Sequence, residues 1–176
     1  MLGNPFFMAD SKILFSEVQG FTQWWFWTII YGVLGSLCFT TYQSFEATGT
    51  IFQTETLTLV LMAILLPGLF YVLKLHTRIV SDGIYVRFVP FHLKEKFIPF
   101  TDLSACYVRQ YSPIGEFGGW GIKYGLGGAG KVYNVSGNQG LQLVYHDGSK
   151  LLIGSKRTEE IQKIMLDLGI FGQSKA

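Results

Sequence analysis

The chain has 176 residues, of which 49% are hydrophobic, and its 14 Lys and Arg against 12 Asp and Glu leave a net charge of +2. This length allows one modest domain beside a membrane anchor, and so small a charge excludes the strongly basic balance that is typical of nucleic-acid-binding proteins. The two cysteines, Cys38 and Cys106, fall in different predicted parts of the chain, so we expect no disulfide between them.

The first part of the chain is nearly free of charge. No Asp, Glu, Lys or Arg lies between Glu17 and Glu46, and the stretch between Glu55 and Lys74 consists mostly of Leu, Val, Ile, Met and Phe. A helix of about 17–25 apolar residues crosses a bilayer. The sequence therefore predicts an N-terminal cytoplasmic segment at 1–20 and a transmembrane hairpin at 21–75, with spans at about 22–43 and 55–75.

The basic residues predict the orientation of this hairpin. The net charge is −3 for residues 1–73 and +5 for residues 74–176, and Lys74, His76 and Arg78 directly follow the second span. Because cationic residues beside a span stay on the cytoplasmic side, we expect both termini to be cytoplasmic.

From residue 76 onward apolar and polar residues alternate, which is typical of half-buried strands. Turn signals such as Ser81-Asp82-Gly83 and His146-Asp147-Gly148 separate these segments, and 91–98, between two prolines, is predicted to be at most an edge strand. The alternation is clearest at 84–88, 103–107, 141–145 and 151–153. About seven strands on short connections favour an antiparallel meander that closes into a barrel or sandwich.

One amphipathic helix is predicted to end the domain. Thr158 is suited to cap its first turn, Ile161 and Met165 belong to a single apolar stripe, and Gly169 is suited to end it. The predicted fold class is therefore α+β, mainly β: a transmembrane helical hairpin, then an antiparallel β-barrel of about seven strands at 76–172 closed by one helix, and a polar tail at 173–176.

Three short segments carry a resemblance to a known family. They are Thr77-Arg78-Ile79-Val80-Ser81-Asp82-Gly83-Ile84, Phe117-Gly118-Gly119-Trp120-Gly121-Ile122-Lys123 and Ile153-Gly154-Ser155. With the two spans and the closing helix, they make the chain resemble the bacterial pleckstrin-homology-like (PH-like) membrane proteins, in which a helical hairpin carries a cytoplasmic PH-like barrel. The resemblance implies a multi-pass location in the bacterial inner membrane, but no particular activity, because fold does not fix function.

The sequence offers no grouping of residues that is typical of catalysis. His76, His92 and His146 are scattered, and no spacing of Cys and His suits zinc. We therefore predict no enzyme activity, no metal and no cofactor.

A glycine-rich segment allows a different interpretation. Residues from Gly125 to Lys131 match both G-x-G-x-x-G and G-x-x-x-x-G-K, which hold phosphates at a helix N-terminus. However, 131–135 is predicted to be a strand, and Val132 stands where a phosphate loop needs Ser or Thr. A bulged hairpin in which glycine allows a positive φ is the structural alternative.

The candidate interaction residues lie in two groups. Trp120, Lys123 and Tyr124 stand among the glycines, where aromatic side chains could grip a partner or enter a headgroup layer. Arg78, Lys94 and Lys96 are candidate contacts for anionic lipid.

The leading hypothesis is a non-enzymatic integral membrane protein whose cytoplasmic PH-like domain binds a protein partner or the membrane surface. Its expected partners are the lipid bilayer and either a protein partner or a second copy of the chain, with no nucleic acid. Two alternatives stay open: a nucleotide-binding enzyme or switch that uses Gly125 to Lys131, and an accessory subunit of a larger membrane transporter complex.

Overall fold

A computed structural model describes residues 12–49 and 54–170, so the predicted tail at 173–176 lies outside the described residues. The chain divides into two compact units. We call residues 20–73 the helical hairpin, and the described residues before and after it, 12–19 and 74–170, the β module.

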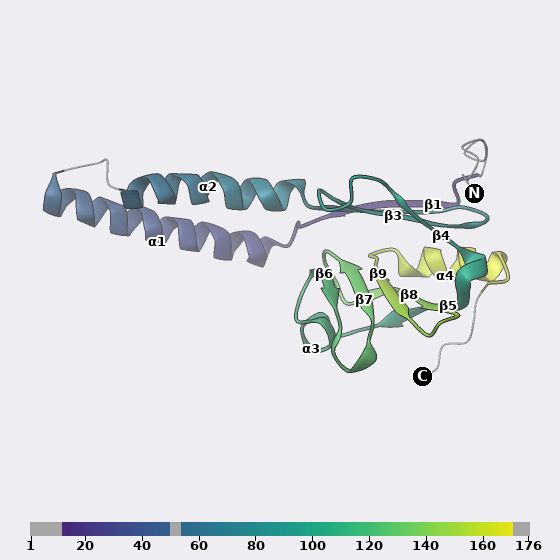
Figure 1. Ribbon diagram of the computed structural model, residues 1–176. Helices are drawn as coiled ribbons and strands as arrows, with labels where there is room; N and C mark the ends of the chain where they lie inside the picture. The colour runs from purple at the N-terminus through teal and green to yellow at the C-terminus, as the bar shows by residue number, and fades with distance from the viewer. Residues whose placement is uncertain (1–11, 50–53, 171–176) are drawn as a thin grey trace, which may run out of the picture. The chain divides into compact units, whose positions relative to one another are not determined.

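The hairpin consists of helix α1 (Trp24–Thr48) and helix α2 (Thr54–Val72), which run side by side (Figure 1). Near its base the rings of Phe21 and Phe26 pack edge-on against Phe70, with centroids 5.3 and 4.5 Å apart. Helix α1 ends at Gly49, whose left-handed backbone (φ 71°) lets its N–H donate to the carbonyl of Phe45. Two helices are therefore confirmed where the apolar stretches predicted them.

The structure does not support the prediction that these two helices are transmembrane spans. Within the described ranges, neither helix combines the length and the apolarity that are needed to cross a bilayer. Hydroxyl side chains recur along α1, where Thr28, Ser36 and Ser44 donate to carbonyls one turn back in their own helix. The transmembrane hairpin was therefore a wrong prediction, and so was the multi-pass inner-membrane location that depended on it.

The first sheet of the β module contains four strands in the order β1-β2-β3-β4. Strands β2, β3 and β4 pair antiparallel, with Ile79 opposite Ile84 and Ile84 opposite Ile98. Ile84, Val86 and Phe88 are buried as the alternation predicted. The four strands are β1 (Phe15–Gly20), β2 (Lys74–Ile79), β3 (Gly83–Val89) and β4 (Lys96–Pro99).

The second sheet contains five strands in the order β5-β8-β9-β7-β6. Neighbours pair antiparallel except β7 and β9, which run parallel with Lys131 opposite Leu151 and Tyr133 opposite Ile153. The five strands are β5 (Leu103–Gln110), β6 (Gly121–Tyr124), β7 (Lys131–Asn134), β8 (Gln139–Tyr145) and β9 (Lys150–Gly154). The short element η2 (Phe100–Asp102) leads from β4 into β5, and α3 (Pro113–Phe117) and η3 (Leu126–Gly128) connect β5 to β6 and β6 to β7.

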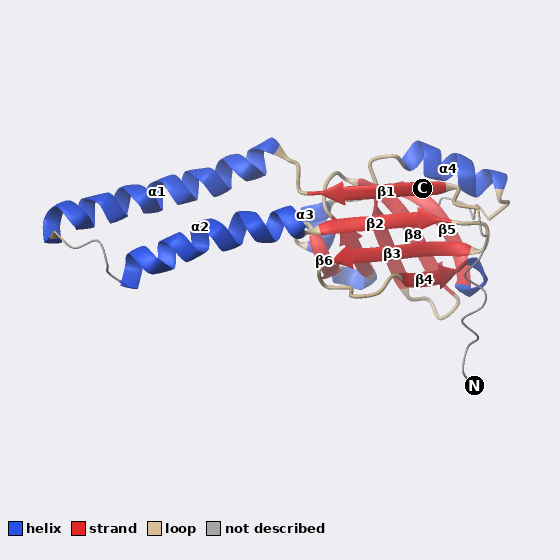
Figure 2. Cartoon of the chain, turned by 90° about the horizontal axis from the view of Figure 1, so that it is seen from above, coloured by secondary structure: helices blue, strands red, loops and turns tan. Residues whose placement is uncertain are grey.

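The closed barrel was also a wrong prediction. The described strands form two open sheets, one in front of the other in Figure 2. The parallel pair of β7 and β9 interrupts the antiparallel meander, because it places β9 between β8 and β7 and so keeps β6 at an edge. The fold is a mixed α+β fold with two sheets.

Strand β1 joins the two sheets at one side of the module. Glu17 is only 8% exposed, and its carboxylate accepts hydrogen bonds from the hydroxyl of Ser155 (2.6 Å) and the backbone N–H of Lys156 (3.1 Å). The amide of Gln19 donates to the carbonyl of Gly154 (2.7 Å). We call these contacts of β1 with residues 154–156 the β1 clasp.

Helix α4 (Thr158–Asp167) packs against β5 and β8 of the second sheet. Its buried residues include Ile161 and Met165, which confirms the predicted apolar stripe. Thr158 was predicted to cap the helix, but it is the first helical residue, and its hydroxyl donates to the side chain of Gln139 (2.7 Å) instead. Gly169 follows the helix with φ 68°, as a residue that ends a helix does.

Candidate functional site: a cleft of lysines and tyrosines beside β4

The sheets leave a cleft of about 610 Å³ at the side of the module where β4 lies. Strand β4 forms one wall, and the other comes from the second sheet, with residues of β7, the start of β9 and the turn between β8 and β9. Because β4 is an edge strand in the described sheet, its backbone on the side away from β3 is not paired with another strand. The open sheets therefore create the site.

Three lysines from three strands line this cleft: Lys96, Lys131 and Lys150. Two carboxylates, Asp102 and Asp147, also line it. Asp147 accepts a hydrogen bond from the backbone N–H of Ser149 (2.8 Å) within the turn, and the bonds to Ser149 lower the pKa of Asp147. The cleft thus carries one more positive charge than negative.

Lys131 lies between two aromatic rings. Its Nζ is 5.1 Å from the ring centroid of Tyr133 and 5.4 Å from that of Tyr124, which are cation–π distances. Interaction with the phenol group of Tyr133, and to a lesser extent with that of Tyr124, raises the pKa of Lys131 against the opposing effect of burial. The ammonium group is therefore firmly protonated at neutral pH, and tyrosines hold it in place.

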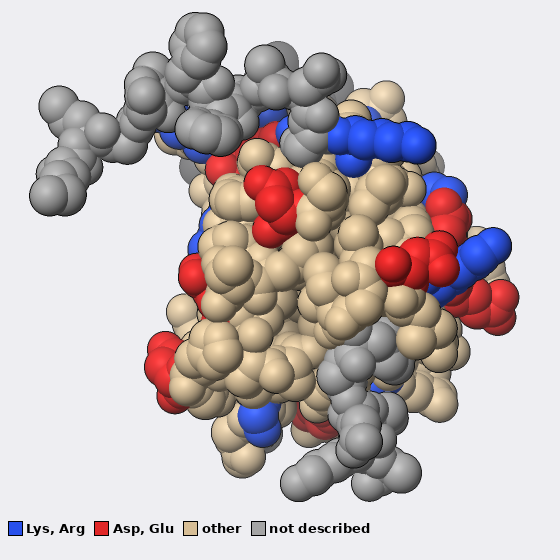
Figure 3. All heavy atoms as spheres, turned by 90° about the vertical axis from the view of Figure 1, so that its right-hand side faces the viewer, with Lys and Arg blue, Asp and Glu red and all other residues tan. Residues whose placement is uncertain are grey.

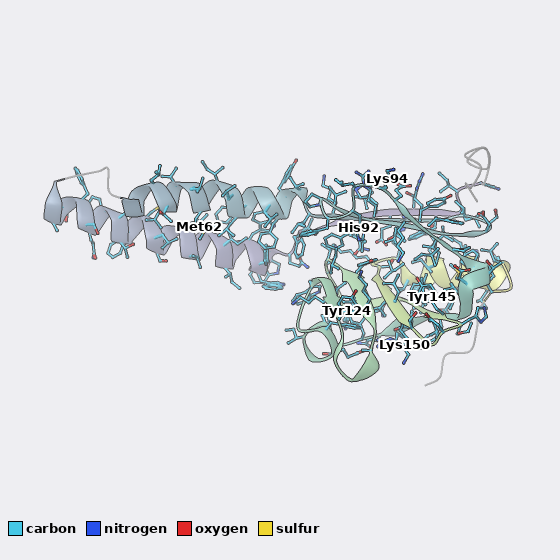
Figure 4. The ribbon with its side chains drawn as sticks, viewed as in Figure 1. Met62, His92, Lys94, Tyr124, Tyr145 and Lys150 are labelled. Carbon is cyan, nitrogen blue, oxygen red and sulfur yellow. The ribbon has the colours of Figure 1, made fainter. Side chains whose placement is uncertain are left out.

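A third tyrosine, Tyr145 at the end of β8, completes the lining of this part of the cleft. Burial, followed by the nearby Tyr133 and two carboxylates, raises the pKa of Tyr145, so its hydroxyl keeps its proton. Figure 4 shows Tyr124, Tyr145 and Lys150 on the second sheet. The site offers phenol hydroxyls and ammonium groups, which are all hydrogen-bond donors.

His92 lies just behind the cleft. Its ring packs edge-on against Tyr133, with centroids 5.1 Å apart, and its Nδ1 accepts a hydrogen bond from the backbone N–H of Phe88 (3.1 Å). Burial, and then the charges of Lys131 and Lys96, lower the pKa of His92. A neutral histidine therefore supports Tyr133 from the first sheet.

The structure brings together two of the six predicted interaction residues, Lys96 and Tyr124, which both line the cleft. Tyr124 is 75% exposed, as a contact residue needs to be. The other four do not line the cleft. Lys94 points away from the second sheet in Figure 4, and the guanidinium of Arg78 pairs with Glu95 and lies over the ring of Tyr85.

The last two of the six predicted interaction residues, Trp120 and Lys123, lie in the glycine-rich segment and make local hydrogen bonds. The indole N–H of Trp120 donates to the carbonyl of Gly137 (3.2 Å), which holds the ring against the turn before β8. The ammonium of Lys123 donates to the carbonyl of Gly118 (2.6 Å). Neither is placed to reach a ligand in the cleft.

Sequence reasoning missed Lys150, Tyr133 and Tyr145 as site residues. Tyr133 stands in an apolar strand, and the other two flank the His146-Asp147-Gly148 turn, so each fits a structural role when it is considered alone. Lys131 was noticed only as part of a phosphate motif. No helix follows the glycines in this part of the described chain; β7 does, as the sequence predicted.

The described residues contain no group of three His, Cys, Asp or Glu side chains that could hold a metal ion. Charge is also not concentrated on the face shown in Figure 3, where acidic and basic side chains are scattered among uncharged ones.

Comparison with protein families gives one match: the profile of a family of unknown function, DUF6141, aligns with residues 10–171. No curated protein and no solved structure matches the chain.

Proposed function

The chain belongs to the DUF6141 family of unknown function, and we propose that its β module is a non-enzymatic binding module that holds an extended, acidic segment of a partner protein in the cleft beside β4. The observation that carries this proposal is the coincidence of an unpaired strand edge with a lining of lysines from three strands.

The edge of β4 supports an extended ligand. An added strand gains main-chain hydrogen bonds from an exposed sheet edge, and alternate side chains then give specificity. Strand β4 has four residues, Lys96–Pro99, of which Pro99 has no N–H to donate. At about 3.3 Å per residue the strand offers an edge of roughly 13 Å, which suits a short segment.

The lining supports an acidic ligand. Lys96, on β4, shares its face of the strand with buried Ile98, as strand alternation requires, and so lies on the side of the second sheet. Lys131 and Lys150 lie across the cleft from it. Opposite charges at a binding surface fix register and exclude wrong partners more than they add affinity.

Exposed apolar side chains beside β4 offer further contacts. Leu93 is 87% exposed in the connection that leads into the strand, and Phe91 and Phe97 are also exposed. The ring of Phe97 packs against that of Tyr85 at a tilt of 35°, with centroids 4.6 Å apart, so it is held on the outer face of the sheet. These groups can pack against apolar residues of the partner segment.

The experiment measures binding of the full-length chain to a fluorescein-labelled peptide that alternates valine and glutamate, by fluorescence anisotropy. We expect this peptide to bind and its lysine-containing counterpart not to bind. A third peptide carries N-methyl groups on alternate backbone nitrogens, which blocks strand pairing on one edge, and we expect it to lose binding when the blocked edge is the one that faces β4.

Variants locate the binding site. Lys131→Met and Lys150→Met should each weaken binding of the acidic peptide several-fold and narrow its advantage over the basic peptide, whereas Lys163→Met, which removes an exposed lysine on α4, serves as the matched control. Equal binding of the acidic, basic and N-methylated peptides would show that the proposal is wrong.

A further inference from the structure

The side chain of Lys131 is prepared for an anion. In the described part of the chain no carboxylate lies within ion-pair distance of its ammonium group; the described ion pairs involve Arg78, Arg109 and Arg157. Its neighbours are instead the rings and phenol oxygens of Tyr124 and Tyr133. A protonated ammonium that is surrounded by neutral groups keeps its charge available to a ligand.

We propose that Lys131, seated on the buried ring of Tyr133 and flanked by the hydroxyls of Tyr124 and Tyr145, forms a pocket for a single carboxylate group of the bound segment. This inference rests on the proposed function and names the chemical group that determines its specificity. Lys131 is the specificity-determining residue of the cleft.

The donors fit a carboxylate. A tyrosine whose ring contacts the Lys131 ammonium still has its own O–H to donate. The three tyrosines come from three different strands or their ends, and all of them line the cleft around the one lysine. A carboxylate has two oxygens with about four acceptor positions, which this set of donors can fill.

The net charge of the residues that line the cleft favours a ligand group with a single negative charge. Lys96, Lys131 and Lys150 line the same cleft as Asp102 and Asp147, so the lining residues carry an excess of one positive charge. A carboxylate neutralises this excess, whereas a phosphate group near −2 leaves an uncompensated negative charge beside two carboxylates. The cleft therefore favours a carboxylate over a phosphate.

Backbone packing fixes the position of Lys131. Gly130, directly before it, has φ 81°, and a Cβ at that position would lie 2.4 Å from the carbonyl oxygen of Lys150. This close approach brings the start of β7 against the start of β9, where Lys131 is opposite Leu151. Lys131 is therefore held at the start of β7, on the face of the sheet that it shares with Leu151, and the backbone of Lys150 lies next to Gly130.

The carboxylate has two sources, an Asp or Glu side chain or the C-terminus of the partner. Four otherwise identical peptides that alternate valine and glutamine distinguish them: one with a C-terminal amide and one central glutamate, one with a free C-terminus and no glutamate, one with a central phosphoserine and an amide, and one fully uncharged amide. Binding to the full-length chain is measured by anisotropy.

We expect at least one single-carboxylate peptide to bind tenfold or more tightly than the uncharged amide, and the phosphoserine peptide to bind no more tightly than that carboxylate peptide. Lys131→Met should remove the preference, and Lys131→Arg should keep part of it. Tyr124→Phe, at a side chain that is mostly exposed and so not needed for folding, should reduce it several-fold. Tyr107→Phe, on β5 outside the lining, should leave it unchanged.

Equal binding of all four peptides would overturn the carboxylate pocket and the preference for an acidic segment, but would leave the binding of an extended segment at β4 intact. If no peptide binds, the proposed function fails, and acetate then tests the pocket directly. A saturable shift of the Lys131 side-chain NMR signals on addition of acetate, stronger than with sulfate, supports the pocket. A linear, unsaturated shift that is equal for the two anions overturns it.

Discussion

We predict that substitutions in the β1 clasp lower the unfolding free energy of the protein. Glu17→Ala removes a nearly buried carboxylate that accepts hydrogen bonds from Ser155 Oγ (2.6 Å) and from the N–H of Lys156 (3.1 Å). Hydrogen bonds to a charged group contribute about 1.5–3 kcal/mol each. Because water can reach the partly buried Lys156 N–H after the substitution, we expect a loss of about 3 kcal/mol rather than the full sum. Glu17→Gln keeps one acceptor and should lose about half as much.

Urea unfolding of the full-length variants, followed by circular dichroism and by tryptophan fluorescence, measures these changes. Asp167→Asn, at an exposed position near the end of α4, is the control and should change the unfolding free energy by less than about 0.5 kcal/mol. If Glu17→Ala proves as stable as the control, the clasp does not hold β1 to the second sheet, and our account of how the module is closed on that side fails.

Three further predictions concern protonation, thiol access and backbone geometry. Acidification should destabilise the fold below about pH 6.5, because burial lowers the pKa of His92 and of His76 in the folded chain. The unfolded chain then binds more protons than the folded one, so the unfolding free energy falls as the pH falls. In urea titrations, the double variant His92→Asn/His76→Asn should reduce this dependence of the unfolding free energy on pH. In the native protein a thiol reagent should modify exposed Cys38 and spare Cys106, which is buried and whose pKa burial raises to about 12. Gly130→Ala should cost about 2 kcal/mol or more in unfolding free energy, because it adds a Cβ at positive φ against a backbone oxygen.

Controls separate the causes of these effects. Gly148→Ala has a similar φ of 80° but open space around the new Cβ, so it should cost clearly less than Gly130→Ala. Equal losses would show that the contact with β9 is not tight. Equal labelling rates of the two cysteines in the folded protein would contradict the burial of Cys106, and a slope that persists in the double histidine variant would contradict the assignment to His92 and His76.

Strand β1 shows where the sequence pattern misleads. Its inner face carries Phe15, Glu17 and Gln19, whereas Val18 is exposed, so the polar and apolar positions are partly reversed. Alternation predicts strands only when apolar side chains face the core. Here the Glu17 carboxylate and the amide N–H of Gln19 find their partners in residues 154–156, far away in the sequence, and nothing in the neighbouring sequence indicates that contact.

The clear alternation at 84–88, 141–145 and 151–153 predicted β3, β8 and β9 well, because each buries a row of aliphatic side chains. The parallel pairing of β7 with β9 was not predictable, since short connections suggest antiparallel neighbours. A purely antiparallel order of about seven strands led to the prediction of a closed barrel. The resemblance to a PH-like domain stays a prediction, whereas the membrane hairpin that went with it was wrong.

The site was predictable only in part. Tyr124 and Lys96 attracted notice as an exposed aromatic and a basic residue, but they are 28 positions apart and on different sheets. Tyr133, which supports Lys131, is 1% exposed, and its apolar surroundings in the sequence favoured a core role. A cleft that is assembled from several strands becomes visible only once the strand order is known.

The most direct test of the central claim is NMR-detected hydrogen exchange of the full-length chain with and without the valine and glutamate peptide. We predict that the peptide slows exchange at the amides of β4 that point away from β3, and shifts the side-chain signals of Lys131 and Tyr124. Protection that appears on other elements while β4 is unchanged would contradict the claim that this cleft binds an extended partner segment.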